Sequence, residues 1–129
     1  MPTRALFDAG AFIALDRNDQ AMWGRFVRDR RLGIERVTHA GVVAQVWRDP
    51  RRQARLAAAI QSVDVVGLSN AMARDVGLLL AQTRTADVID GALACLARDG
   101  DVLYTSDPAD MLILLDGRRL LKRVTVVEV

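Results

Sequence analysis

Two aspartates follow short apolar segments of the sequence, where a carboxylate would lie at the end of a strand. Asp8 comes directly after the apolar residues 5–7, and Asp107 comes one serine after the apolar residues 102–105. In a parallel sheet covered on both faces, ligands bind in the crevice beyond the carboxyl ends of the strands. We therefore expect Asp8 and Asp107 to lie at the edge of the sheet where a site would form.

A second pair of aspartates lies on one expected helix. The apolar residues between Val88 and Leu96 form one stripe of a helix that begins near Asp87, which places Asp87 and Asp90 together on another face. Carboxylates about 4 Å apart repel each other by roughly 4 kcal/mol at an effective dielectric constant near 20. A hard cation such as Mg²⁺ or Mn²⁺, which prefers oxygen ligands, would offset this repulsion. Such an ion can orient a phosphate ester and activate water, so the reaction class is metal-assisted phosphodiester hydrolysis.

Helix capping is the alternative for each acid taken singly. Asp8 can cap the helix that follows it, and Asp107-Pro108-Ala109-Asp110 has the form of an acidic N-cap followed by proline. Asp87 and Asp90 can belong to a solvated helix face near the positive helix end. Independent caps have no reason to converge on one end of a sheet, and convergence would favour the metal site.

Composition excludes several other kinds of site. Cys95 is the only cysteine and His39 the only histidine, which excludes a disulfide framework, a cysteine or histidine zinc cluster and a histidine-based triad with separate bases. We expect a surface or capping role for His39, at the start of the helix with Val42 and Trp47. No glycine-rich phosphate loop is present. Nearly all bases are arginines, which suits a phosphate-bearing partner, and Arg48, Arg51, Arg52 and Arg55 form a group that can hold RNA or simply face solvent.

The pattern along the chain predicts one α/β domain over residues 1–129. Consecutive apolar runs at 5–7, 34–37, 63–68, 102–105 and 124–129 alternate with helical segments, which is typical of a parallel sheet covered on both faces. We expect three layers, a sheet of four to five strands between two layers of helices. We also expect Thr38 to cap the third helix and Pro50 to start the next one. The apolar runs are too short to span a membrane, and the first residues are unlike a secretory leader, which predicts a cytoplasmic protein.

Three segments carry a resemblance to a known family. Residues 7–15, 87–92 and above all 105–110 resemble the PIN-domain family, and in size and layout the VapC-like toxin ribonucleases. The resemblance covers essentially the whole chain. It implies a Mg²⁺- or Mn²⁺-dependent endoribonuclease, with an RNA substrate, a homodimer and an antitoxin protein that blocks the site. The site residues that it implies are metal-site acids at Asp8, Asp90 and Asp107, nearby acids at Asp87 and Asp110, and outer polar side chains at Thr105 and Ser106.

One position departs from the family pattern. The family usually places a glutamate on the helix after the second strand, and this chain has Gln45 there. An amide oxygen can accept a hydrogen bond but adds no charge, and losses of this kind cost about 10 to 100-fold in metal affinity or activity. Two rival hypotheses follow: a catalytically weakened PIN-fold module that binds RNA or an antitoxin-like protein, and a dimerising α/β module whose aspartates only cap helices.

Overall fold

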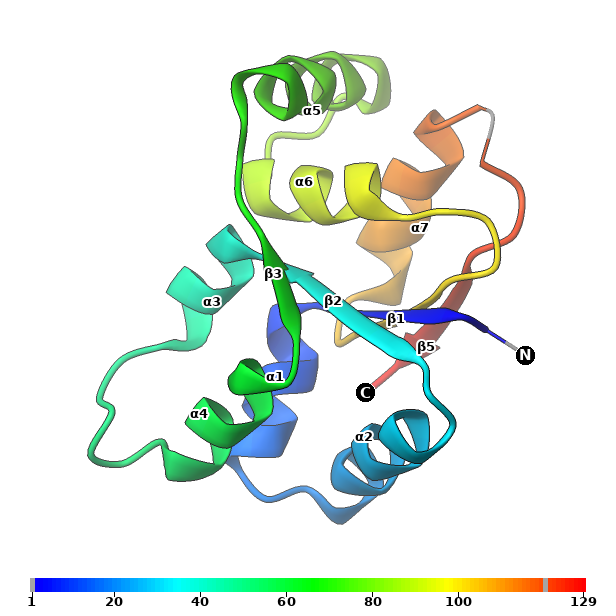
Figure 1. Cartoon of the computed structure of the whole chain (residues 1–129). Helices are drawn as coiled ribbons and strands as arrows, with labels where there is room; N and C mark the ends of the chain where they lie inside the picture. The colour runs from blue at the N-terminus through cyan, green and yellow to red at the C-terminus, as the bar shows by residue number, and fades with distance from the viewer. Residues whose placement is uncertain (1, 120) are drawn as a thin grey trace.

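A computed structural model describes residues 2–119 and 121–129 of the chain. Its five strands form one sheet in the order β3-β2-β1-β4-β5, and every neighbouring pair is parallel (Figure 1). The strands are β1 (Arg4–Phe7), β2 (Glu35–His39), β3 (Asp64–Val66), β4 (Val102–Thr105) and β5 (Thr125–Glu128). The predicted parallel sheet is confirmed, with strand β4 at the predicted bounds.

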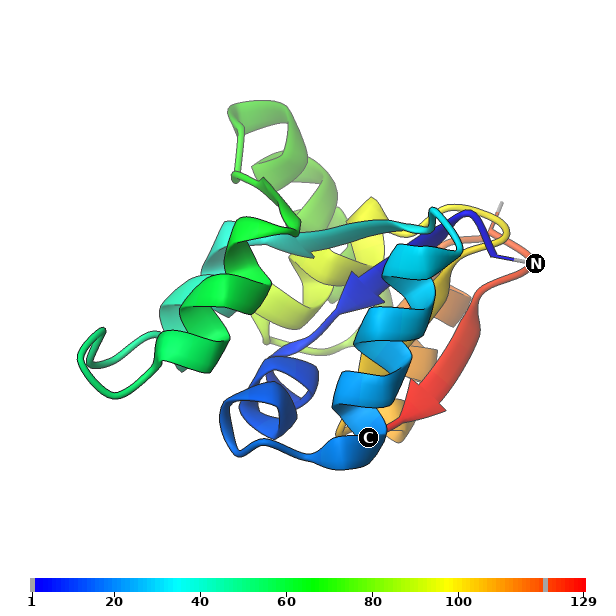
Figure 2. The ribbon, with the colours of Figure 1, turned by 60° about the horizontal axis from the view of Figure 1, so that its bottom comes forward.

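Helices cover both faces of the sheet, as predicted. Helix α1 contacts α2, α3 and α4, whereas α5, α6 and α7 contact one another on the opposite face (Figures 1 and 2). The helices are α1 (Ala9–Asp16), α2 (Gln20–Arg31), α3 (Ala40–Val46), α4 (Ala54–Gln61), α5 (Asn70–Thr83), α6 (Val88–Leu96) and α7 (Pro108–Gly117). None of the helices in the described part of the chain is long and apolar enough to cross a bilayer.

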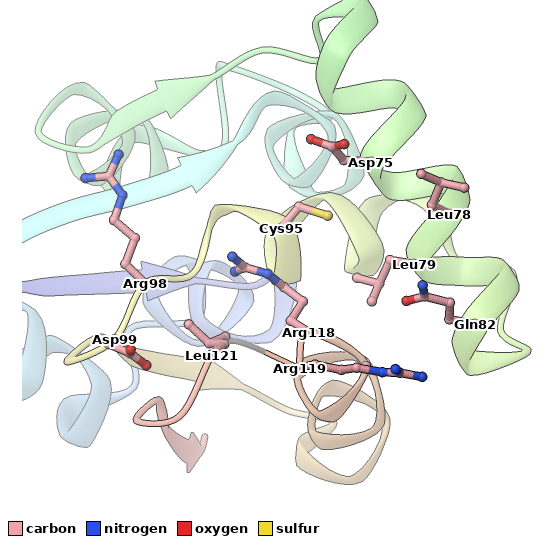
Figure 3. Close-up of a pocket in the computed structure, with 11 residues that line it drawn as sticks. Asp75, Leu78, Leu79, Gln82, Cys95, Arg98, Asp99, Arg118, Arg119 and Leu121 are labelled. Atoms are coloured by element: carbon pink, nitrogen blue, oxygen red, sulfur yellow. The ribbon is translucent and has the colours of Figure 1, made fainter.

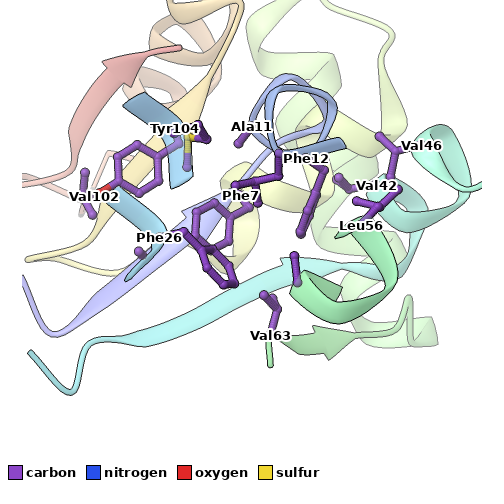
Figure 4. Packing of buried hydrophobic residues seen from close by; sticks show 14 of the residues in the cluster. Phe7, Ala11, Phe12, Phe26, Val42, Val46, Leu56, Val63, Val102 and Tyr104 are labelled. Atoms are coloured by element: carbon purple, nitrogen blue, oxygen red, sulfur yellow. The ribbon is translucent and has the colours of Figure 1, made fainter. Parts of the chain in front are cut away.

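Alternate side chains of the central strands pack in two separate hydrophobic cores, one on each face of the sheet. Phe7 and Tyr104 face the core shared with α1, α2, α3 and α4, and Leu6 and Leu103 face the core under α5, α6 and α7. Phe7 stacks on Tyr104 with ring centroids 5.4 Å apart and lies 5.7 Å from Phe26 (Figure 4). Because side chains alternate across a strand, this double burial fixes the register of β1 against β4.

The beginning of α3 differs from the prediction. His39, and not Thr38, is its N-cap, and His39 Nδ1 accepts a hydrogen bond from the backbone of Gly41 at 2.9 Å. Thr38 is fully buried in β2, where its hydroxyl donates to the carbonyl oxygen of Phe7 at 2.7 Å. The strand extends two residues past Val37 because β3 supplies partners for it, Val65 opposite Thr38 and Val66 opposite His39.

Pro50 does not start a helix, contrary to the prediction. Helix α4 begins at Ala54, after the N-cap residue Gln53. The buried side chain of Gln53 organises the loop instead, since its oxygen accepts from the backbone of Arg48 and Asp49 and its nitrogen donates to Val46. These hydrogen bonds satisfy backbone groups that a helix starting at Pro50 would leave to solvent.

Candidate functional site

The candidate site lies where the chain connections diverge, beyond the carboxyl ends of β1 and β4. These two strands are neighbours, and the next strands along the sheet are β2 beside β1 and β5 beside β4. Helix α1 leaves β1 toward one face and α7 leaves β4 toward the other (Figure 1). Such a switch point opens a crevice between the two connections. Asp8 and Asp107 stand at its two sides.

Asp8 is a cap and also part of the interior. Its side chain is only 6% exposed, and Oδ1 accepts a hydrogen bond from the backbone of Ala9 at 2.7 Å. Oδ2 accepts from the hydroxyl of Thr105 at 2.7 Å, and the Asp8 backbone donates to Tyr104 at 3.0 Å. One carboxylate oxygen of Asp8 therefore caps α1, and the other accepts a hydrogen bond from Thr105 of β4.

Asp107 is not used as a cap. It occupies the N-cap position of α7, but its side chain makes no capping hydrogen bond, and the residue is exposed. Its backbone N–H donates to the hydroxyl of Thr105 at 3.0 Å. The single hydroxyl of Thr105 thus joins Asp8 to the backbone of Asp107, which ties the two strand ends together.

Replacing Thr105 by valine should loosen this connection. Thr105 is fully buried, so the variant would leave Asp8 Oδ2 and the Asp107 backbone without their partner. We expect a loss of about 1–3 kcal/mol in the free energy of unfolding, measured by urea denaturation. Thr105→Ser keeps the hydroxyl and should lose less than half as much. A loss in Thr105→Ser larger than the loss in Thr105→Val would show that packing of the methyl group, and not the hydrogen bonds, matters there.

Asp87 and Asp90 bring a third element to the same place. Asp87 caps α6 by accepting from the backbone of Asp90 at 2.9 Å. The pKa of Asp90 is raised to about 7, first by burial and then by the charges of Asp8, Asp87, Asp107 and Asp110, in that order. Each of these carboxylates therefore lies near enough to repel Asp90. The acids from β1, α6 and α7 converge, although Asp8 and Asp87 also cap helices.

Asp110 completes the acidic group on its solvent side. Its pKa is raised by a hydrogen bond with Asp107, by the charge of Asp107 and, to a smaller extent, by Asp87. Asp110 is exposed, one turn into α7. The carboxyls of Asp107 and Asp110 are therefore side by side. The two residues are three apart in the sequence, at the start of α7.

The donor set suits a hard cation that keeps much of its water. All five side chains offer carboxylate oxygens, and the amino ends of α1, α6 and α7 gather at this edge of the sheet. Among residues 2–119 and 121–129, no three His, Cys, Asp or Glu side chains form a ready-made metal cage. Mg²⁺ does not require one, because it commonly uses one or two carboxylates together with water and substrate phosphates. The chemistry of the residues fits such an ion.

A cleft of about 490 Å³ lies between α1, the residue after β4 and Val129 after β5. Gly10 and Ser106 line it, next in sequence to Ala9 and Asp107, and a Cβ atom on Gly10 would lie 2.4 Å from the Ser106 hydroxyl oxygen. The absence of a side chain at Gly10 thus lets α1 approach the end of β4. The remaining lining residues are Ile13, Ala14, Arg17, Asp19 and Val129. The cleft offers an apolar wall and the exposed guanidinium of Arg17 at the carboxyl end of α1, and none of the five acids lines it.

Other residues considered from the sequence have different surroundings. Gln45 is exposed on α3. Arg48 donates to the carbonyl oxygens of Ala44 and Trp47, and Arg51 and Arg52 pair with Asp49 at 3.2 Å and 3.8 Å. These arginines are engaged within their own loop and do not lie among the acids.

His39 is buried, so the expected surface placement is wrong while the expected capping role is confirmed. Its side chain is 4% exposed, Nδ1 is occupied by the α3 cap, and Nε2 is buried without a hydrogen-bond partner. Burial lowers its pKa. Continuing the register of β1 and β2 places His39 opposite Asp8. The sequence held no signal for this burial, which depends on β2 reaching as far as His39.

Comparison with known proteins supports the fold. No family model matches the chain, and no curated protein matches it in sequence. A chain of VapBC2 from Rickettsia felis, in a crystal structure bound to a DNA fragment from their promoter, is similar in structure with a TM-score of 0.67. The match covers 98% of each chain at 9% sequence identity. The five-stranded parallel sheet with helices on both faces is therefore a PIN-like fold, as predicted from the sequence.

Proposed function

We propose that this chain is a metal-dependent endoribonuclease of the PIN type and the toxin of a toxin–antitoxin pair. The observation that carries the nuclease proposal is the environment of Asp90, whose carboxyl is partly buried among four other acids at the switch point of the sheet. A group of like charges held there by separate elements is costly without a cation. The PIN-like fold supports the same reading.

We assign different roles to the five acids and to Thr105. Asp8, Asp90 and Asp107 would hold Mg²⁺ or Mn²⁺, and Asp87 and Asp110 would add negative charge around it. When bound, such an ion supplies a Lewis acid that polarises a phosphate ester and activates water. Thr105 keeps Asp8 and the start of α7 at a fixed separation through its two hydrogen bonds.

The cleft along α1 would suit a strand of RNA. Ile13 and Val129 give it an apolar wall that a base can cover, and Arg17 is an exposed cation within it. Guanidinium groups hold phosphate oxygens well. Ser106 lines the cleft and precedes Asp107 in the sequence, so a strand bound there would run toward Asp107.

Binding of a metal is expected to stabilise the chain. At a free Mn²⁺ concentration of 100 times the dissociation constant, the free energy of unfolding should rise by about 2.7 kcal/mol. Differential scanning fluorimetry with Mn²⁺, Mg²⁺ and EDTA measures this directly, and Asp8→Asn should abolish most of the rise. A labelled RNA should be cleaved with either ion and not with EDTA. An unchanged melting temperature together with metal-independent cleavage would contradict the proposal.

The partners follow from the same proposal. The proposed partners are an antitoxin protein, a second copy of the chain and an RNA substrate. The proposed location of the protein is the cytoplasm. The similarity to a chain of VapBC2, determined with a promoter DNA fragment, supports the toxin–antitoxin assignment. Co-expression with the product of an adjacent short reading frame, followed by co-purification, tests the antitoxin.

Gln45 favours a second candidate function, that of a binding module with little or no nuclease activity. An amide stands on α3 where the family has an acid, and it is exposed beyond the end of β2. Gln45→Glu should raise cleavage by about 10 to 100-fold if the missing charge limits metal binding. Activity that appears only in this variant would identify the natural chain as a binder. Strong cleavage by the unaltered chain would reject that candidate.

A further inference from the structure

A second concave surface lies on the face of the protein covered by α5, α6 and α7. We call it the α5–α7 groove, a cavity of about 500 Å³ between the exposed side of α5 and the carboxyl ends of α6 and α7 (Figure 3). It is lined by Asp75, Leu78, Leu79, Gln82, Cys95, Arg98, Asp99, Gly117, Arg118, Arg119 and Leu121. The acids of the candidate site stand at the amino ends of α6 and α7, so the groove is separate from them.

One wall of the groove is apolar and left open. Leu78 is 65% exposed, the most exposed of the large hydrophobic side chains in the described part of the chain, while Leu79 beside it is buried. Leu121, from the segment after α7, also lines the groove, on the other side of Arg118 from these two leucines (Figure 3). An exposed leucine that continues a buried apolar surface is typical of a place where a partner side chain inserts.

The other wall is strongly basic. Arg98, Arg118 and Arg119 line it, and Lys122 and Arg123 follow directly in the sequence. Within residues 2–119 and 121–129, none of these five cations forms an ion pair with a carboxylate.

The two acids of the groove leave this positive charge largely in place. Asp99 accepts hydrogen bonds from the backbone of Lys122 and Arg123, which fold the basic segment against the end of α6. Asp75 stands on the opposite wall, on α5. Arg118 donates to the carbonyl oxygens of Ala94 and Ala97 at the end of α6, so the base of the wall is held rigidly.

We propose that the α5–α7 groove binds an acidic peptide segment of a partner protein that presents one or two bulky apolar side chains. The apolar wall would receive those side chains, and the basic wall would pair with flanking carboxylates. A cavity of this size holds a few side chains rather than a whole helix bundle. The proposal does not depend on the nuclease function.

Two other occupants fit the groove less well. Nucleic acid would use the arginines, but no aromatic side chain lines the groove for a base to stack on, and Leu78 would stay uncovered. A second copy of the chain in a symmetric pairing would bring the same basic wall against itself, which like charges oppose.

Selection from a displayed library of short random peptides on the full chain tests the proposal. Enriched sequences should combine Asp or Glu with leucine-like residues. A fluorescent copy of the best peptide should bind Leu78→Asp and Arg119→Glu about tenfold more weakly, as expected for central contacts worth about 1.4 kcal/mol. The matched controls Leu112→Asp, 47% exposed on the outside of α7, and Arg55→Glu, exposed on α4, should bind it like the parent.

Cys95 reports occupancy of the groove independently, because it is the only cysteine and lines the cavity. Burial raises the pKa of its thiol, so alkylation is best followed at about pH 9. Saturating peptide should slow alkylation at least about threefold.

Enrichment of basic or neutral peptides, no enrichment, or full binding by Leu78→Asp and Arg119→Glu would overturn the proposal. So would protection of Cys95 by an RNA oligonucleotide but not by peptide, or a dimer that Leu78→Asp dissociates.

Discussion

Asparagine at position 8 is expected to reduce RNA cleavage about 10² to 10³-fold, since a lost metal carboxylate removes several kcal/mol of transition-state stabilisation. Asn keeps an oxygen that can accept from the Ala9 backbone, and its amide can donate to the Thr105 hydroxyl. The fold should therefore survive, and the loss should fall on catalysis. Initial rates on a labelled RNA at saturating Mg²⁺, with circular dichroism as the check on folding, measure it.

Asp116→Asn is the matched control for Asp8→Asn. Asp116 is exposed near the end of α7, away from the acids at the amino end of that helix, and the substitution makes the same change of charge. It should cleave within about twofold of the parent, as surface substitutions usually have little effect. If Asp8→Asn cleaves as well as the parent and needs the same metal, the nuclease proposal is wrong.

Asparagine at position 90 is expected to stabilise the metal-free protein at alkaline pH while abolishing cleavage. The pKa of Asp90 is raised from 3.8 to about 7, by burial first and then by its acidic neighbours. Ionisation of Asp90 above pH 7 therefore opposes folding. For a half-buried group we expect a gain of about 1–2 kcal/mol in the variant after allowance for solvent screening. This corresponds to a rise of about 3–8 °C in melting temperature.

The stability difference between Asp90→Asn and the parent should depend on pH. Between the unfolded pKa near 4 and the folded pKa near 7, the folded state holds the extra proton, so the parent loses stability as pH rises. The penalty is complete above pH 7 and absent below pH 4. The melting temperatures of variant and parent should converge near pH 4 and separate toward pH 8. A constant difference across that range would contradict the assigned pKa, and saturating Mn²⁺ should reverse the order of stability above pH 7.

Local sequence signals were enough for most of the elements. The run from Val102 to Thr105 predicts β4 with its observed bounds, and α6 begins after Asp87, as predicted. A capping side chain acts within three residues, so its effect is visible in the sequence. Pro50 misled the prediction because the loop after α3 is organised by Gln53, whose partners were not evident from spacing.

The shared position of the acids was predictable from topology, but their double use was not. A residue between a strand and a helix can cap the helix and bond to a neighbouring strand at once, as Asp8 does with its two oxygens. Asp107 has the stronger capping pattern in the sequence and makes no capping bond. Sequence alone therefore cannot separate a capping acid from a site acid, because both stand at the same boundary.

Contacts between residues that are far apart in the sequence could not be predicted from it. Arg4 looks like a polar residue before the first strand, yet it lies within β1 and pairs with buried Asp101 at 3.1 Å. Tyr104 donates to buried Asp29 at 2.8 Å across the face of the sheet. Each partner is more than seventy residues away, and no spacing rule connects them.

The place of β1 in the sheet affects how the chain folds during its own synthesis. β1 is made first but lies between β2 and β4, and its pairing with β4 must await Val102–Thr105. At ribosomal rates of about 5–20 residues per second, the nascent chain carries an unpaired central strand edge for several seconds. Asp8 and Asp107 can meet only after the chain has been translated as far as Asp107. Truncated products are thus expected to be catalytically inert and to need chaperones.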